Sequence, residues 1–294
     1  MRILLAGAAG QVARSLVEAG RTRGVDLVAF GRPDLDLTRE SDVVRVVADV
    51  KPDVVINAAA FTAVDLAESE PEAAHLLNAT AAGWLAREAA RVDAPILHVS
   101  TDYVFDGAKP APYLEDDVVR PLGVYGASKL AGELAVAAAN PRHVVARTAW
   151  VYSPFGKNFV RTMLHLASDR EELAVVADQI GNPTYAPHIA EAMLVIASQC
   201  TKPDVGTRWG VFHLVAPDEA TWADLAEATF AESGARGGAC ARVRRITAAE
   251  YPTLARRPQN SRLDASKLQR IYGVRLPPWR EGVTACVSRI IAEA

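Results

Sequence analysis

Cysteine is scarce in this sequence of 294 residues, and its three copies form no pattern. Cys200, Cys240 and Cys286 are odd in number and lie far apart, which excludes both a disulfide framework and a zinc site with closely spaced cysteine ligands. A histidine metal site is not indicated either, since no two of the six histidines lie three to five residues apart. We therefore expect free thiols in a reducing cytosol and no metal centre.

Strong net charge and long apolar runs are missing too. The formal net charge of −3 gives no electrostatic reason to expect a nucleic-acid partner. No apolar run reaches the ~18 residues that cross a membrane, and the first residues have the pattern of a strand rather than of a signal peptide. We expect a cytoplasmic protein with neither a membrane nor a nucleic-acid partner.

The first half of the chain alternates apolar strands with amphipathic helices, which is typical of a parallel sheet with helices on both faces. The expected strands are residues 2–6, 26–30, 53–57, 95–100 and 143–148. The expected helices between them are residues 12–23, 41–50, 71–91 and 125–139. This pattern predicts an α/β protein with a doubly wound parallel (Rossmann) sheet.

The alternation breaks down after Trp150, where Pro, Gly and Arg become frequent. A helix is expected at 155–168, a strand near 173–176, a helix at 187–200 and a strand at 210–215. We predict that residues 1–150 form a dinucleotide-binding domain to which 187–215 returns. Residues 151–186 and 216–294 would form a smaller α+β substrate lobe, with the ligand in the cleft between the two parts.

A glycine-bearing turn follows the first strand. In Gly7-Ala8-Ala9-Gly10-Gln11-Val12-Ala13 the glycines permit a sharp turn and let the backbone approach a diphosphate, whose charge is favoured by the free amides at the helix start. Ala13 stands where the dinucleotide fingerprint has its third glycine, and a plain βα turn would look similar. The turn therefore predicts a dinucleotide site only together with the residues downstream.

Two hydroxyl groups, those of Thr101 and Tyr125, are expected at the carboxyl edge of the predicted sheet. Thr101 ends the fourth strand, and Tyr125 and Lys129 share one face of the following helix because they are four residues apart. The ammonium of Lys129 can lower the pKa of Tyr125, and Thr101 can hold a carbonyl oxygen. The set can protonate a ketone as a hydride arrives, although an ordinary helix turn can also carry this spacing.

Several longer segments of the sequence resemble a known family of enzymes. The turn described above, residues 100–107 and residues 125–129 resemble the extended short-chain dehydrogenases that act on nucleotide sugars. Within them the chain is most similar to the dTDP-4-dehydrorhamnose reductase family, nearly end to end. The segments that carry this likeness are residues 57–70 (NAAAFTAVDLAESE), 158–164, 178–184 and 257–263.

The resemblance implies an NADPH-dependent oxidoreductase that reduces the C4 ketone of dTDP-4-dehydro-β-L-rhamnose to give dTDP-L-rhamnose. Thr101, Tyr125 and Lys129 would be the catalytic trio. Tyr125 would give its proton to the C4 oxygen, Thr101 would hydrogen-bond the same oxygen, and Lys129 would hold the nicotinamide ribose.

Cofactor contacts are expected at the carboxyl ends of the strands and in the segments that match the family. The predicted cofactor-binding residues are Gly7, Gly10, Gln11, Val12, Arg32, Asp36, Leu37, Ala59, Ala60, Phe61 and Thr62, together with Tyr125 and Lys129. Arg32 stands where an acidic residue would bind a ribose 2′-hydroxyl, and it can pair with a 2′-phosphate instead. We therefore expect NADPH to be preferred and NADH to be accepted less well.

Substrate contacts are expected from Thr101, Asp102, Tyr103, Trp150, Asn158 and Arg257. Tyr103 stands where the similar sugar 4,6-dehydratases carry an acidic residue, and its ring can pack against the sugar. Trp150 is the matching aromatic on the other side, or a core tryptophan near the lobe interface. Arg257, or its neighbour Arg256, could grip the substrate diphosphate, and the alternative is a solvated basic turn.

Two rival functions and the oligomeric state stay open. An epimerase or dehydratase could use the same fold, and a non-catalytic nucleotide-binding regulatory subunit resembles the same family. Some reductases of this family bind magnesium at a dimer interface through a glutamate on the first helix, where this chain has Ser15. Glu18 lies one turn further on and could replace it. We expect no metal and a monomer or weak homodimer.

Overall fold

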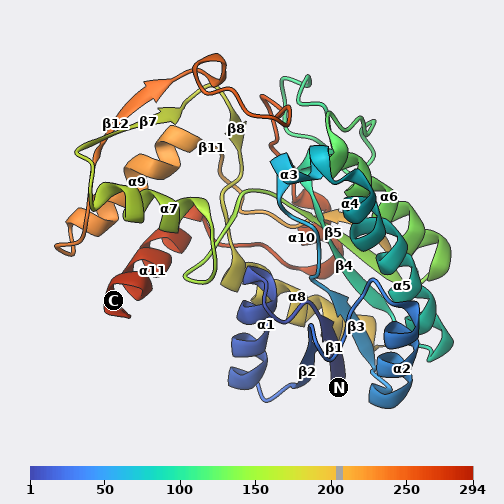
Figure 1. Cartoon of the computed structure of the whole chain (residues 1–294). Coiled ribbons are helices and arrows are strands. Elements are labelled where there is room, and N and C mark those ends of the chain that lie inside the picture. Colours follow the sequence, from blue (N-terminus) through green and yellow to red (C-terminus); the bar gives the residue numbers. More distant parts are fainter. Residues whose placement is uncertain (203–207, 294) are drawn as a thin grey trace.

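The computed structural model describes residues 1–202 and 208–293. Its centre is a sheet of six parallel strands in the order β10-β5-β4-β3-β1-β2 (Figure 1). These strands are β1 (Arg2–Ala6), β2 (Asp26–Phe30), β3 (Val54–Asn57), β4 (Ile96–Thr101), β5 (His143–Thr148) and β10 (Gly210–His213). Their apolar sequences suit burial on both faces.

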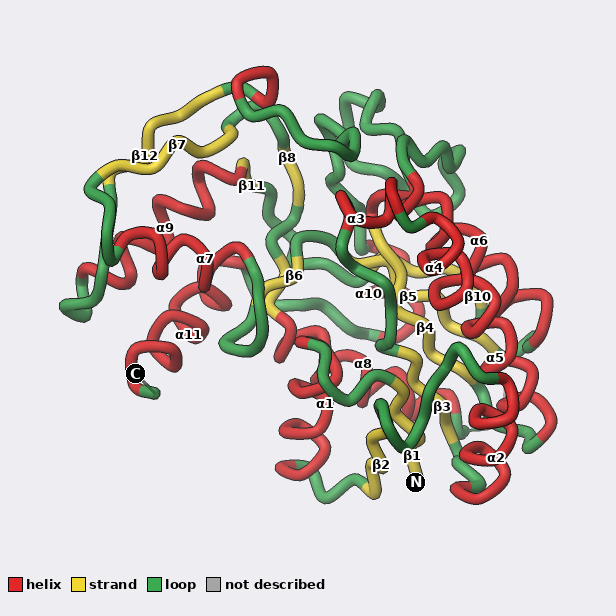
Figure 2. Tube along the Cα trace, in the orientation of Figure 1, coloured by secondary structure: helices red, strands yellow, loops and turns green. Residues whose placement is uncertain are grey.

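Helices cover both faces of this sheet (Figure 2). On one face lie α1 (Gln11–Thr22), α8 (Ala186–Cys200) and α10 (Ser266–Tyr272), whose apolar side chains share a core with the strands. On the other face lie α2 (Glu40–Val50), α5 (Ala81–Arg91) and α6 (Val124–Ala139). The predicted doubly wound parallel sheet is therefore confirmed.

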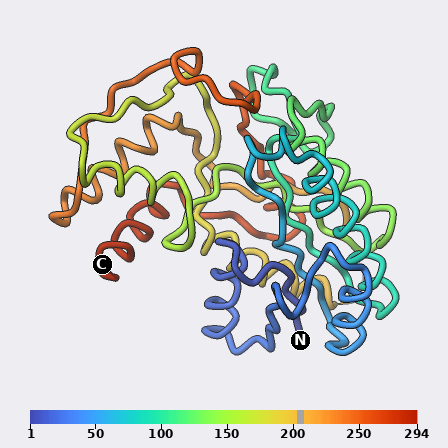
Figure 3. Tube along the Cα trace, in the orientation of Figure 1, coloured from blue at the N-terminus to red at the C-terminus, as the bar shows by residue number. Residues whose placement is uncertain are grey.

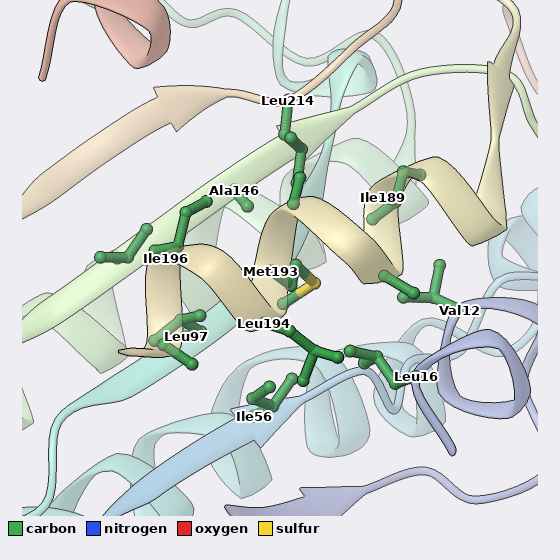
Figure 4. Packing of buried hydrophobic residues seen from close by; sticks show 14 of the residues in the cluster. Val12, Leu16, Ile56, Leu97, Ala146, Ile189, Met193, Leu194, Ile196 and Leu214 are labelled. Carbon is green, nitrogen blue, oxygen red and sulfur yellow. The ribbon is translucent and has the colours of Figure 1, made fainter. Parts of the chain in front are cut away.

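Helix α8 is the clearest case of how the sequence builds this core. Figure 4 shows Ile189, Met193 and Ile196 on it, among side chains of the sheet and of α1. Their spacing of three to four residues places them along one side of the helix. Segment 187–215 thus supplies a helix and the strand β10, which pairs with β5, to the central sheet.

The predicted helix over 71–91 is interrupted by a π turn. It consists of α4 (Pro71–His75), the π-helical segment η1 (Leu76–Thr80) and α5. Buried Asn78 in η1 accepts a hydrogen bond from the Phe61 amide at 2.7 Å, and its side-chain nitrogen donates to the Phe61 carbonyl and to the Ser128 hydroxyl. Asn78 therefore ties the loop after β3 to α6, and π turns of this kind are frequent at functional sites.

The rest of the chain forms a group of helices and short strands beside the sheet. Its path runs through the green, yellow, orange and red segments of Figure 3, and the C-terminus lies there while the N-terminus lies at the sheet. The paired short strands are β6 (Val151–Tyr152) with β9 (Thr184–Tyr185), β7 (Glu172–Val176) with β12 (Arg242–Ile246), and β8 (Ile180–Gly181) with β11 (Ala220–Thr221). The helices are α7 (Phe159–Ala167), α9 (Trp222–Gly234) and α11 (Trp279–Ala292).

Two predicted boundaries in this part are wrong. The helix expected from 155 begins at Phe159, because the Asn158 side chain accepts from the Arg161 amide and so caps the helix start. The strand expected to reach 215 ends at His213. Three short helices complete the structure: α3 (Val64–Ser69), η2 (Asp102–Val104) and η3 (Ala248–Glu250). Within the described ranges, no helix has the length and apolar character needed to cross a membrane.

Candidate active site

The turn between β1 and α1 touches the end of β3. Gly7 has φ of 103°, and a Cβ atom there would lie 2.7 Å from the Ala59 nitrogen, so only glycine fits. Gly10 precedes α1, and no side chain in the described part of the chain caps the helix there. A close backbone approach and free helix amides at one edge of the sheet are what the diphosphate of a dinucleotide needs.

The other predicted cofactor residues of the first helix and second strand lie around this turn. Gln11 accepts a hydrogen bond from the Ser153 hydroxyl at 2.8 Å. Val12 and Leu37 are buried in the two cores, so only their backbones can face a ligand. Arg32 is exposed beyond β2, and Asp36 accepts from the amide and hydroxyl of Thr38, which lowers the pKa of Asp36.

The loop after β3 is held from two sides. The Ala59 amide donates to the Asn57 side-chain oxygen at 3.1 Å, and Asn78 holds both backbone groups of Phe61. Ala60 is partly exposed and Thr62 is exposed. The predicted loop residues therefore sit at the carboxyl edge of the sheet beside Gly7.

The segment after β4 turns tightly through η2. Thr101 accepts from the Tyr103 amide at 3.2 Å and donates its hydroxyl hydrogen to Asp102 at 2.9 Å. The other carboxylate oxygen of Asp102 is buried and has no partner among the described residues. Burial raises the pKa of Asp102 to about 6. Asp102 is thus a buried acid beside the Thr101 hydroxyl.

Helix α6 brings Tyr125 against η2. The contact depends on Gly126, where a Cβ atom would lie 2.2 Å from the Tyr103 carbonyl oxygen. The rings of Tyr103 and Tyr125 meet edge to face, with 5.6 Å between centroids. Both tyrosines line a small hollow to which Arg256 and Pro258 also contribute. The predicted Thr101, Tyr103 and Tyr125 are therefore brought together.

The expected lowering of the Tyr125 pKa by Lys129 is wrong for the chain as described. The pKa of Tyr125 is raised to about 12, chiefly by burial and to a smaller extent by the Asp102 carboxylate, while the hydrogen bond with the Thr101 hydroxyl lowers it. Lys129 is buried and its side-chain nitrogen donates to the Val99 carbonyl at 2.7 Å. Desolvation of Tyr125 therefore outweighs any effect of the lysine charge in this conformation.

Glu133 and Arg147 form a buried ion pair that sequence reasoning missed. Arg147 on β5 donates to both carboxylate oxygens of Glu133, at 2.9 and 2.7 Å, and the Ser100 hydroxyl donates to the same carboxylate at 2.6 Å. Glu133 lies two turns beyond Tyr125 on α6. The pair therefore ties α6 to β4 and β5, and a charged residue inside the apolar run of β5 was the available signal.

Three predicted substrate residues have strong protein partners. Trp150 has φ of 46°, stacks on Trp222 at 3.6 Å between centroids, and donates its indole hydrogen to Ser261. The Asn158 amide nitrogen donates to the carbonyls of Ser153 and Phe155, which leaves only its oxygen for a further contact.

Arg257 is the third of these residues. It pairs with Asp65 at 3.1 Å, while Arg256 is exposed. The Arg257 side chain keeps partial exposure, and its Nε is buried without a partner in the described structure. Arg257 therefore retains a donor that its ion pair does not use.

The candidate magnesium ligands of α1 are engaged within the chain. The Ser15 hydroxyl donates to the Gln11 carbonyl at 2.9 Å, and Arg289 binds both oxygens of Glu18, at 2.7 and 2.8 Å. Over residues 1–202 and 208–293, no group of three or more His, Cys, Asp or Glu side chains is placed to hold a metal ion.

We predict that Gly126→Ala lowers both the melting temperature and the turnover number, because the new methyl group forces α6 away from η2 and separates Tyr125 from Thr101. Ala137→Gly on the exposed side of the same helix is the control, and it should cost ~1 kcal/mol of stability without changing turnover. Parent-like turnover of a folded Gly126→Ala protein would contradict the account of this contact.

Known proteins are similar to this chain over nearly its whole length. The family model described as RmlD substrate binding domain matches residues 1–291. A dTDP-4-dehydrorhamnose reductase of Sinorhizobium fredii is 46% identical over 293 residues, covering 100% of this chain and 99% of that protein.

Two solved structures are similar over nearly the whole chain. A dTDP-4-dehydrorhamnose reductase from Clostridium acetobutylicum has a TM-score of 0.92 at 35% identity, covering 99% of this chain and 100% of its own. The enzyme of the same name from Bacillus anthracis, solved in complex with NADP, has a TM-score of 0.89 at 33% identity, covering 100% of this chain and 99% of its own.

Proposed function

Since the chain belongs to the dTDP-4-dehydrorhamnose reductase family, we propose that Thr101, Tyr125 and Lys129 are the residues that carry out the family's reaction here. The chain is an NADPH-dependent oxidoreductase, and the reaction is reduction of the C4 ketone of dTDP-4-dehydro-β-L-rhamnose to dTDP-L-rhamnose. The observation that supports these residues most is the packing of Tyr125 beside the Thr101 segment, which Gly126 permits.

Each residue of the trio has a distinct task. Tyr125 gives its hydroxyl proton to the ketone oxygen as that oxygen becomes negative. When the substrate is bound, Thr101 turns its one hydroxyl hydrogen from Asp102 to the same oxygen, and the sugar ring packs against Tyr103. Because burial keeps the pKa of Tyr125 at about 12, the hydroxyl is protonated at neutral pH and ready to act as the acid.

The residues present fit NADPH, which supplies the hydride when it is bound. The amides of the Gly7–Gln11 turn would hold its diphosphate, and the loop from Ala59 to Thr62 would line its ribose and nicotinamide side. Asp36 and the backbone of Leu37 would border the adenine. Lys129 would hold the nicotinamide ribose through its hydroxyl groups.

We predict that NADPH is preferred over NADH and that Arg32→Ala removes most of this preference. Arg32 is an exposed cation beyond β2, where it can pair with the 2′-phosphate that only NADPH carries. Steady-state kinetics with both cofactors is the measurement, and Arg39→Ala, another exposed arginine of the same region, is the control. Equal efficiency with NADH, unchanged in Arg32→Ala, would contradict this role.

We predict that turnover needs no metal ion. Proton donation by Tyr125 leaves no charge on the ketone oxygen for a Lewis acid to neutralise, and the Glu18 carboxylate is held by Arg289. Turnover and sedimentation are measured with and without EDTA, and a monomer or weak homodimer is expected in both. Activity lost with the chelator and restored by magnesium would refute this claim.

A direct assay tests the proposed function. The purified protein, in the cytoplasmic setting that we propose for it, should consume NADPH in the presence of dTDP-4-dehydro-β-L-rhamnose and yield dTDP-L-rhamnose. Product identification by chromatography separates the three outcomes. Sugar interconversion without loss of NADPH would indicate an epimerase, and no reaction at all would indicate a binding protein.

A further inference from the structure

Buried His98 is a titratable residue that the proposed chemistry does not use. It lies on β4, fully buried, between Asn57 on β3 and Lys129 on α6. Asn57 and His98 are register partners on neighbouring strands, and their side chains meet at 3.1 Å. The other ring nitrogen of His98 lies 3.4 Å from the Lys129 nitrogen. One imidazole thus connects the loop after β3 to the lysine.

The Ala59 amide determines where the hydrogens lie in the series of hydrogen bonds that runs through Asn57 and His98 to Lys129. The Ala59 amide can only donate, so the Asn57 atom that it contacts is the side-chain oxygen. The Asn57 nitrogen therefore faces His98 and donates to Nδ1. Since Nδ1 accepts, the neutral ring must carry its hydrogen on Nε2, and that hydrogen points at Lys129.

Lys129 can accept this hydrogen only without its own third proton. Its nitrogen already donates to the Val99 carbonyl at 2.7 Å, and an ammonium would set a second N–H against the N–H of His98. A neutral amine offers a lone pair there instead. The described conformation is therefore one that suits the amine.

We propose that His98 is a positioning residue that favours the amine form of Lys129 until the cofactor binds, so that NADPH binding draws protons from solvent onto the fraction of Lys129 that is an amine. This inference rests on the proposed function, in which Lys129 holds the nicotinamide ribose. Ribose hydroxyl oxygens and the Tyr125 hydroxyl can accept from an ammonium, whereas the N–H of His98 cannot. On leaving His98 the amine therefore takes up H⁺ and becomes an ammonium.

The surrounding charges agree with this assignment. The titratable groups that act on Lys129 are His98 from β4 and Glu133 on α6 itself, and Glu133 is paired with Arg147 from β5. Burial lowers the pKa of Lys129 to about 8, with only Glu133 opposing it, and burial and Lys129 together lower the pKa of His98. A lysine with this pKa changes charge within the range in which the enzyme can be assayed.

The first test measures proton uptake. Calorimetric titration of the wild-type protein with NADPH, in buffers of different ionisation enthalpy, should show net proton uptake that is larger at pH 9 than at pH 7, because more of Lys129 is then an amine. In His98→Gln the side-chain amide can turn its oxygen to Lys129, so the uptake should vanish while NADPH still binds. His143→Gln, on the neighbouring strand β5, should behave like the wild type.

The second test needs no variant and no cofactor. Nitrogen-15 NMR of histidine-labelled wild-type protein should show His98 as the Nε2–H tautomer at pH 9, where most of Lys129 is an amine. An Nδ1–H tautomer, a wild-type uptake near zero, or an uptake unchanged in folded His98→Gln would each overturn the proposal. Failure of NADPH to bind at all would instead refute the proposed function, and the tautomer would still be readable.

Discussion

Tyr125→Phe is expected to keep the fold and NADPH binding while turnover falls by roughly 10²–10⁴-fold, the usual contribution of a general acid. Only the hydroxyl is removed, and the ring that packs edge to face on Tyr103 remains. The turnover number is measured with the dTDP sugar, and the melting temperature and the NADPH affinity are measured on the same preparation.

Tyr113→Phe is the matched control for this variant. Its hydroxyl donates to Asp106 at 2.8 Å, outside the trio, and its ring stacks on Phe105. This variant should therefore change stability slightly and turnover little. A folded Tyr125→Phe protein that retained more than a third of the parent turnover would show that another group delivers the proton.

Glu133→Ala is expected to destabilise the protein by roughly 3–5 kcal/mol, because it leaves the Arg147 guanidinium buried without its partner. The two side chains are each about 4% exposed and make two hydrogen bonds to each other. Chemical denaturation measures the loss. Asp26→Ala, which breaks the exposed pair with Arg2, should cost under ~1 kcal/mol.

A double variant separates charge burial from simple loss of contact. Glu133→Leu with Arg147→Met removes both charges and keeps apolar volume, so it should recover most of the lost stability. If Glu133→Ala cost less than ~1 kcal/mol, or if the double variant were no better than the single one, the buried pair would not hold α6 to the sheet in the way described.

The strands of the first half could be predicted within one or two residues, because each is an apolar run closed by a turn signal. Asp26–Phe30 and His143–Thr148 begin and end where expected. The π turn at Leu76–Thr80 could not be predicted from the local pattern, and its Asn78 contacts Phe61 and Ser128, which lie 17 and 50 residues away in the sequence.

The small strands of the second half were beyond sequence reasoning for a different reason. Val151–Tyr152 and Thr184–Tyr185 are two residues each, too short to show an alternation, and their partners are more than 30 residues apart in the sequence. The parallel partner of Glu172–Val176 is likewise a distant strand, Arg242–Ile246.

The sequence allowed us to predict which residue types form the candidate site. It did not allow us to predict their pKa values. The spacing of Tyr125 and Lys129 places them on one helix face, as expected, and they stay a prediction as catalytic residues. The pKa directions depend on burial and on which acceptor Lys129 meets, here the Val99 carbonyl. In the sequence, the only sign of the buried residues Glu133, Arg147 and His98 is that each is a polar residue within an apolar or helical segment.

The central claim is that this chain moves a hydride from NADPH to C4 of the sugar, and tracing a label tests it most directly. NADPH carrying deuterium at both C4 positions of the nicotinamide is incubated with dTDP-4-dehydro-β-L-rhamnose, and the product is analysed by mass spectrometry and NMR. The account predicts dTDP-L-rhamnose with one deuterium at C4, formed in step with NADPH consumption. A product without deuterium at C4, or an isomer of the substrate formed while NADPH is unchanged, would contradict it.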